Sequence, residues 1–123
     1  MSIDSSAFAD HVLELMADLP DVSARRMFGA QGIFREGLMF ALMAEGTLYL
    51  KTDEETEAEF EERDLPSFIV MRKDRQMVTS YRPCPEEAME KSSAMTRWAT
   101  VAWEAAVRED EKKSASKRKR QAG

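Results

Sequence analysis

Residues 22–51 read VSARRMFGAQGIFREGLMFALMAEGTLYLK, a stretch in which short apolar runs alternate with glycine-containing breaks. The runs predict strands over 22–28, 33–35, 38–43 and 48–51. The breaks at 29–32, 36–37 and 44–47 are too short for anything but antiparallel pairing. Glu36-Gly37 suits a tight turn with positive φ at its second residue. The stretch therefore predicts an antiparallel meander, with a bend or bulge between Gly29 and Gly32.

Helical periodicity flanks this meander on both sides. Before it, an apolar stripe ends at Pro20, and its members are Phe8, Val12, Leu15, Met16 and Leu19. After it, Thr52 and Glu55 have the spacing of a capping box, which predicts a helix to about Arg63. Pro85 suits the first turn of a short helix. A last helix, capped by Ser92 or Ser93, carries the stripe Met95, Trp98, Ala99, Ala102 and Ala106.

A second hairpin is predicted between these helices. Residues 68–72 and 77–82 are rich in branched and aromatic side chains and flank the polar segment 73–76. The predicted fold class is therefore α+β, with an antiparallel sheet of about six strands in two groups, flanked by N-terminal, middle and C-terminal helices. The core candidates are Met27, Phe28, Phe40, Leu42, Leu48, Leu50, Phe60, Val70, Val78 and Trp98.

The charge distribution divides the chain into a body and a tail. Of 18 basic and 23 acidic residues in 123, six basic and no acidic ones lie in 112–123. Residues 1–111 therefore hold 12 basic and 23 acidic side chains. The tail has no branched aliphatic or aromatic residue with which to offset its ordering entropy. We expect one domain over 1–110 and a disordered basic tail over 111–123.

Composition also narrows the cellular setting and the chemistry. The single cysteine, Cys84, cannot form an internal disulfide, and no signal-peptide core follows the N-terminus, so we expect a cytoplasmic protein. The longest apolar run, 38–44, is far shorter than the roughly 20 residues of a membrane helix. One histidine and one cysteine in separate segments predict no metal site. No nucleophile has an identifiable base beside it, so we expect no catalytic residue and no cofactor.

Charged residues supply the candidate contact sites. The candidates for contact with nucleic acid or an acidic partner are Arg25, Arg26, Lys112, Lys113, Lys117, Arg118, Lys119 and Arg120. The tail is equally well explained as a solubilising segment. The preferred interpretation of the acidic stretch 53–64 is a solvated helix face. The alternative is a surface that contacts a basic partner through Glu54, Glu57 and Glu61.

Two tryptophans in the last predicted helix, Trp98 and Trp103, lie about 140° apart around its axis, too wide for one narrow stripe. A broad buried face explains this spacing best. The alternative is that one of them anchors a dimer or partner contact.

An ordered series of motifs resembles the TfoX N-terminal domain family. The first half of the series is RRMFG at 25–29, GI at 32–33, GLMFA at 37–41, LYLK at 48–51 and Asp53. The second half is Phe60, Phe68, the segment 77–81 with its TSY, PEEA at 85–88 and Trp98. The resemblance covers about residues 8–107, and no single motif in it is decisive.

This resemblance implies an α+β domain with a role in bacterial DNA transformation. It implies a regulator of competence genes that acts with the cyclic-AMP receptor protein at promoters, as a coactivator without an enzymatic reaction. Two features depart from the family pattern. A basic tail stands where full-length regulators continue into a second helical domain, so we expect a stand-alone N-terminal domain. Ala30 follows Gly29 where many relatives have a second glycine.

Three functional hypotheses follow. The first is a non-catalytic interaction module in competence or transcriptional regulation, with a protein partner and non-specific DNA contact through the tail. The second is a domain or enzyme that holds an anionic small molecule at the Gly29–Gly32 bend with Arg26 and Tyr49. The third is a structural homodimer whose tail only solubilises it.

Overall fold

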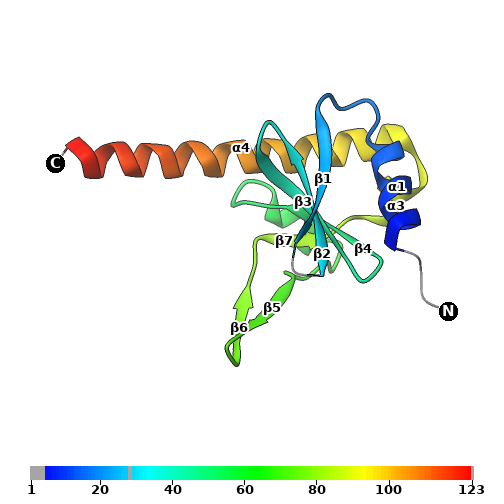
Figure 1. The fold of residues 1–123 in the computed structure, drawn as a ribbon, viewed down its shortest axis with the longest axis horizontal. Coiled ribbons are helices and arrows are strands. Elements are labelled where there is room, and N and C mark those ends of the chain that lie inside the picture. Colours follow the sequence, from blue (N-terminus) through cyan, green and yellow to red (C-terminus); the bar gives the residue numbers. More distant parts are fainter. Residues whose placement is uncertain (1–4, 28, 123) are drawn as a thin grey trace.

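The computed structural model describes residues 5–27 and 29–122, with the side chains of residues 7–27 and 29–116. The structure confirms the predicted α+β fold class (Figure 1). In chain order the elements are α1 (Ser5–Leu15), β1 (Val22–Met27), β2 (Ala30–Arg35), β3 (Leu38–Ala44), β4 (Thr47–Lys51), α2 (Glu57–Glu61), β5 (Ile69–Arg72), β6 (Arg75–Val78), β7 (Tyr81–Pro83), α3 (Glu86–Glu90) and α4 (Ser92–Ala122).

Five strands form the main sheet in the order β1-β2-β3-β4-β7, and every neighbouring pair is antiparallel. The predicted meander is thus confirmed as β1 to β4. The β2–β3 turn places Glu36 at φ 49° and Gly37 at φ 80°. Glycine at the second of these positions avoids the steric cost that a Cβ meets in the left-handed region.

The predicted bend between Gly29 and Gly32 is shorter in the structure. Strand β2 already begins at Ala30, so Gly32 lies inside it, paired with Arg25 of β1 and Leu42 of β3. A Cβ on Gly32 would lie 2.7 Å from Met39 Sδ. Glycine is needed here because neighbouring side chains fold over the strand, and the irregularity falls one step later, between Ile33 and Phe34.

The second hairpin is confirmed, but its second arm was predicted too long. Strands β5 and β6 close at Lys73 and Asp74, which have φ 49° and 64°. The segment predicted as one strand divides at Thr79 and Ser80, after which β7 joins β4. The carbonyl of Ser80 accepts from the backbone N–H of Thr52 at 2.7 Å, which secures this return. The described residues therefore contain seven strands rather than about six.

The core lies between the sheet and α4, which crosses β3 and β4 (Figure 1). The predicted stripe of α4 is buried from Met95 to Ala106, and Val12 and Met16 bring α1 into the same core. Among the core candidates, those confirmed as buried are Phe40, Leu48, Leu50, Phe60 and Trp98. Leu42 and Val70 are half-buried, and Met27 is exposed. Phe28 lies outside the described residues.

Two core candidates were wrong, Met27, which is 36% exposed, and Val78. Val78 is 70% exposed, because the β5–β6 hairpin projects from the body instead of packing on the helices. Alternation of apolar and polar residues along a strand predicts that one face of the strand is buried. It does not show whether a helix extends far enough to cover that face at Val78.

The predicted capping box at Thr52 is also wrong. The Thr52 hydroxyl donates to the Ser80 carbonyl at 2.9 Å and does not receive the Glu55 backbone N–H that a capping box requires. Asp53 instead accepts from the backbone N–H of Glu55 at 3.1 Å and forms the turn before α2. Helix α2 is consequently short, five residues, and does not continue to Arg63.

Beyond residue 110 the structure differs from the expected disorder, because α4 continues to Ala122. Alanine, lysine, arginine and glutamine are all good helix formers, a preference that an argument from burial alone leaves out. Figure 1 shows this end of α4 projecting away from the sheet, and residues 111–116 are exposed. The domain boundary near residue 110 stays a prediction. None of the described helices has the length and apolar character needed to cross a membrane.

Candidate functional site

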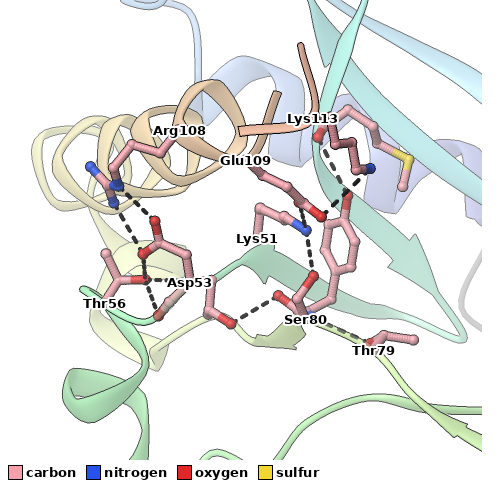
Figure 2. Close-up of polar contacts among 11 residues, drawn as sticks. Lys51, Asp53, Thr56, Thr79, Ser80, Arg108, Glu109 and Lys113 are labelled. Carbon is pink, nitrogen blue, oxygen red and sulfur yellow. Dashed lines mark hydrogen bonds and ion pairs between the residues drawn. The ribbon is translucent and has the colours of Figure 1, made fainter. Parts of the chain in front are cut away.

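A cluster of ion pairs joins α4 to the end of the sheet (Figure 2). Lys51, the last residue of β4, is only 6% exposed. Its ammonium group contacts the Ser80 hydroxyl and the Glu109 carboxylate, and it lies 5.3 Å from the centre of the Tyr81 ring. A buried cation is tolerated here because oxygen atoms and an aromatic face replace its water.

A second ion pair lies beside the first. Arg108 Nε donates to Asp53 Oδ2 at 2.6 Å and Arg108 Nη2 donates to Oδ1 at 3.1 Å. Glu55 adds a second carboxylate, 2.5 Å from Arg108 Nε. We call Lys51, Asp53, Arg108 and Glu109 the α4 clamp, since each pair joins α4 to the segment 51–53.

Three clamp residues, Asp53, Arg108 and Glu109, have pKa values shifted in favour of their charged forms. The hydrogen bond from Arg108 lowers the pKa of Asp53 below its ordinary 3.8, and the same bond raises the pKa of Arg108. Burial alone would raise the pKa of Glu109, but the hydrogen bond and charge of Lys51, with Lys113, outweigh it and lower that pKa. None of these shifts brings a group towards neutral pH, where general acid–base catalysis needs one.

Two further groups have raised pKa values. Burial, with a smaller contribution from the charge of Glu87, raises the pKa of the Cys84 thiol to about 12. Burial also raises the pKa of the Tyr81 hydroxyl, and Glu109 adds to the effect. Cys84 is thus a thiol at neutral pH, and a thiolate is the form that acts as a nucleophile. In the part of the chain that the structure describes, no three His, Cys, Asp or Glu side chains are grouped to hold a metal ion.

The candidate basic contacts lie on two separate elements. Arg25 and Arg26 are exposed on β1, and the Arg25 guanidinium lies 5.0 Å from the centre of the Phe34 ring. Lys112 and Lys113 are exposed on α4, and Lys113 is 3.6 Å from Glu109. The remaining candidates share the α4 backbone but their side chains lie outside the described ones, and they are Lys117, Arg118, Lys119 and Arg120.

The acidic candidates are exposed but not isolated. Glu61 lies 3.3 Å from Arg82, which reduces its availability to a partner. Glu54 and Glu57 line a cavity of about 510 Å³ that also includes Lys51 and Lys112. The surface around α2 is therefore of mixed charge rather than uniformly acidic.

The two tryptophans have different surroundings. Trp98 is 1% exposed, packs edge-on against Phe60 and donates to Glu87 at 3.1 Å. Trp103 is half-buried, packs edge-on against Phe40 and lies under the Arg35 guanidinium at 4.9 Å. Both rings pack within their own domain, and only Trp103 has surface that a partner could contact.

The sheet face turned away from α4 forms an apolar groove that sequence reasoning missed. Pairing along the strands places Met27, Gly32, Met39, Leu42 and Tyr49 on this face. The segment 68–71 forms its other wall. The groove has a volume of about 580 Å³ and is lined by Met27, Gly29, Ala30, Gly32, Met39, Leu42, Ala44, Glu45, Tyr49, Phe68, Ile69, Val70 and Met71. We call it the outer-face groove.

Strand register separates the residues of the anionic-ligand hypothesis. Arg26 pairs with Gln31, which pairs with Met43, on the face towards α4. Tyr49 pairs with Leu42 on the opposite face. Arg26 and Tyr49 therefore do not converge on one ligand, although Gly29 and Gly32 line the groove on the Tyr49 side.

Comparison with known proteins gives the family. The model of the TfoX N-terminal domain matches residues 14–106, which include the sheet, the hairpin and the packed part of α4. The chain belongs to the TfoX N-terminal domain family. Within this TfoX N-terminal domain, the outer-face groove lies inside the matched region, as do Lys51 and Asp53 of the clamp, whereas Arg108 and Glu109 follow its last residue.

A curated relative supports the same assignment. The DNA transformation protein TfoX1 of Aliivibrio fischeri (strain ATCC 700601 / ES114) is 32% identical over 71 residues. The match covers 58% of this chain and spans 34% of the length of the relative.

One sequence signal could have revealed the groove. Strand β3 reads LMFALMA without polar alternation, and a strand that is apolar on both faces has contacts expected on both faces. The clamp has no comparable signal, because Asp53 and Arg108 are 55 residues apart.

Proposed function

We propose that this chain is a non-catalytic regulatory module that promotes the expression of competence genes by binding a protein partner. Its membership of the TfoX N-terminal domain family and its similarity to a DNA transformation protein support the pathway. Under this proposal the protein works in the cytoplasm, which agrees with its single, unpaired cysteine.

The observation that carries the protein-binding part is the outer-face groove. Large apolar side chains are left accessible along it, with Ile69 48% and Met71 66% exposed. Contiguous exposed apolar surface on a small domain marks an interaction site. Methionine suits such a surface because its flexible, polarisable side chain adapts to a partner.

A genetic experiment tests the regulatory role. The gene is deleted in its own bacterium and restored from a plasmid, and competence-gene transcripts and uptake of marked DNA are measured. The proposal expects both to fall on deletion and to recover on restoration. Unchanged transcripts and unchanged uptake in the deletion strain would contradict it.

Non-specific DNA contact is a second part of the proposal. The basic residues after 111 lie on a helix that projects from the body, where they could follow phosphates without reading bases. Fluorescence anisotropy with a generic duplex compares the full chain with a 1–111 truncation. Binding that weakens with salt and disappears on truncation is expected. Equal binding by both forms would assign the contact to the body.

The homodimer hypothesis gives a different result in solution. Sedimentation of the full chain at working concentration would show a dimer if self-association were its role. A monomer leaves the groove free for another protein, as the proposed function requires.

A further inference from the structure

One wall of the outer-face groove is the edge of a strand with unused backbone groups. The turn at Lys73 and Asp74 makes Arg72–Arg75 the closing pair of the β5–β6 hairpin. In a two-residue hairpin this closing pair is hydrogen-bonded, and such pairs alternate along the ladder. Val70–Met77 is then the next bonded pair. The bond from Thr79 N–H to the Phe68 carbonyl, 2.9 Å, continues the same alternation.

The residues between these pairs direct their backbone groups away from β6. These residues are Ile69 and Met71, and both line the groove. Outside helices and strands, the backbone bonds of the described residues include none to either one. An unpaired strand edge next to an apolar floor is the arrangement to which an extended peptide adds as a further strand.

The floor of the groove offers places for alternate side chains of such a strand. Met39 and Leu42 lie on the outer face, and Tyr49 packs against Phe68 with ring centres 4.4 Å apart. Gly32 has no side chain of its own, and the side chains of Met39, Phe34 and Met27 fill the space over it, so the floor there is made of apolar side-chain atoms. Successive side chains of a strand point to opposite sides, so every second residue of the peptide would meet this floor.

Four basic residues that neighbour the lining residues form a rim beside the groove, although the body as a whole is acidic and the lining itself carries Glu45. Arg25 shares the outer face with Gly32, and the hairpin turn carries Arg72, Lys73 and Arg75 next to Met71. All four are exposed, and none takes part in the ion pairs of the described residues. Glu45 and Asp74 offset only part of this charge. A partner with carboxylates on either side of its apolar residues is therefore complementary to the rim.

We propose that the outer-face groove binds an extended segment of a partner protein, in which apolar residues alternate and acidic residues flank them. The segment pairs with the free edge of β5, places alternate apolar side chains on the floor and sets its carboxylates against the basic rim. This proposal rests on the proposed function, because it names the surface through which the module meets its partner.

A second copy of this chain fits the groove less well. The edge strands that a copy could offer are β1 and β7 of the main sheet, β6, and β5 itself. Each carries arginine, with Arg25 and Arg26 on β1, Arg82 on β7, Arg75 on β6 and Arg72 on β5. Any of these strands would bring positive charge to a positive rim.

The test is a selection of short random peptides displayed on phage, with the full-length chain as bait. Met71→Glu is the blocking variant, because an acidic side chain in the groove removes apolar contact and repels the acidic flanks of the peptide. Val78→Glu is the matched control, since Val78 is on the same hairpin, 70% exposed and outside the groove lining. Circular dichroism and urea midpoints confirm that both variants fold.

The proposal expects enriched peptides with alternating apolar residues and flanking Asp or Glu. Measured by fluorescence anisotropy, their binding should weaken at least about tenfold in Met71→Glu and stay within about twofold in Val78→Glu. Methylation of the peptide backbone nitrogens that face β5 should also abolish binding, and higher salt should weaken it.

Five results would overturn the proposal, four of them from the peptide selection and sedimentation. These four are no enrichment over the Met71→Glu bait, enrichment of basic peptides, enrichment of apolar residues at helical spacing, and a dimer in sedimentation that Met71→Glu dissociates. The last would assign the groove to a second copy. Tight binding to a generic duplex that Met71→Glu removes would assign it to nucleic acid instead.

The peptide selection and the genetic experiment can refute their two proposals independently. Peptide binding with no change of competence transcripts on deletion would refute the regulatory role and keep the groove. The opposite result is also possible: the deletion strain loses competence, the Met71→Glu gene restores it as well as the wild-type gene does, and no peptide is enriched. That result would refute peptide binding in the groove and leave the regulatory role standing.

Discussion

The α4 clamp offers a quantitative test of how α4 is held to the sheet. Arg108 and Asp53 make two charge-assisted hydrogen bonds, and their side chains are 30% and 13% exposed. Charge-assisted hydrogen bonds in bidentate geometry are stronger than hydrogen bonds between neutral groups, while the remaining solvent screens part of the attraction. We therefore expect a coupling free energy of about 1–2 kcal/mol between the two side chains.

A double-mutant cycle measures this coupling. Asp53→Asn keeps an oxygen for the Glu55 backbone N–H, and Arg108→Met keeps the aliphatic stem. Urea unfolding of the wild type, the two single variants and the double variant near neutral pH gives the coupling. Glu109 and Lys113 provide a control cycle, because they are an i,i+4 pair 3.6 Å apart that is 39% and 71% exposed. Such a pair is expected to contribute about 0.3–0.5 kcal/mol.

The coupling should also depend on pH in one direction. The pKa of Asp53 is lower in the folded protein than its ordinary 3.8. On acidification the unfolded chain therefore takes up a proton at Asp53 first, so the stabilisation is complete well above pH 3.8 and declines as the pH falls below it. A coupling below about 0.5 kcal/mol near neutral pH, or one that persists unchanged in strong acid, would refute the clamp.

Three further outcomes are expected. Trp98→Ala should lower the free energy of unfolding by about 3–5 kcal/mol, because it empties the site between Phe60 and α4, and chemical denaturation would show this. Cys84 should resist alkylation by iodoacetamide in the folded protein and react once urea unfolds it, since burial raises its pKa to about 12; equal rates in both states would be inconsistent with that burial. Amide hydrogens of residues 111–122 should exchange far faster than those of the packed part of α4, as mass spectrometry of exchanged peptides can show, because a projecting helical end lacks tertiary packing.

Much of the fold could be predicted where the information is local. The glycine breaks defined β1 to β4, and the apolar stripes of α1 and α4 were found because burial on one face repeats every 3.6 residues. Predictions failed where a distant residue competes for a local group. Thr52 was expected to cap a helix, but its hydroxyl donates to Ser80, 28 residues later, and Asp53 receives the Glu55 N–H instead. The strand expected over 77–82 divides for the same reason, because β4 captures its second half.

By itself, then, the sequence determined the α+β class, the order of its elements, the family resemblance and the two groups of basic residues. These follow from periodicity, short connections and composition, which act over a few residues. Only the tertiary structure decided that Arg26 and Tyr49 lie on opposite faces, that Arg108 meets Asp53, and that the hairpin stands off the sheet to leave a groove. Such relations depend on strand register and on packing between segments far apart in the chain, and a shift of one residue would reverse every face.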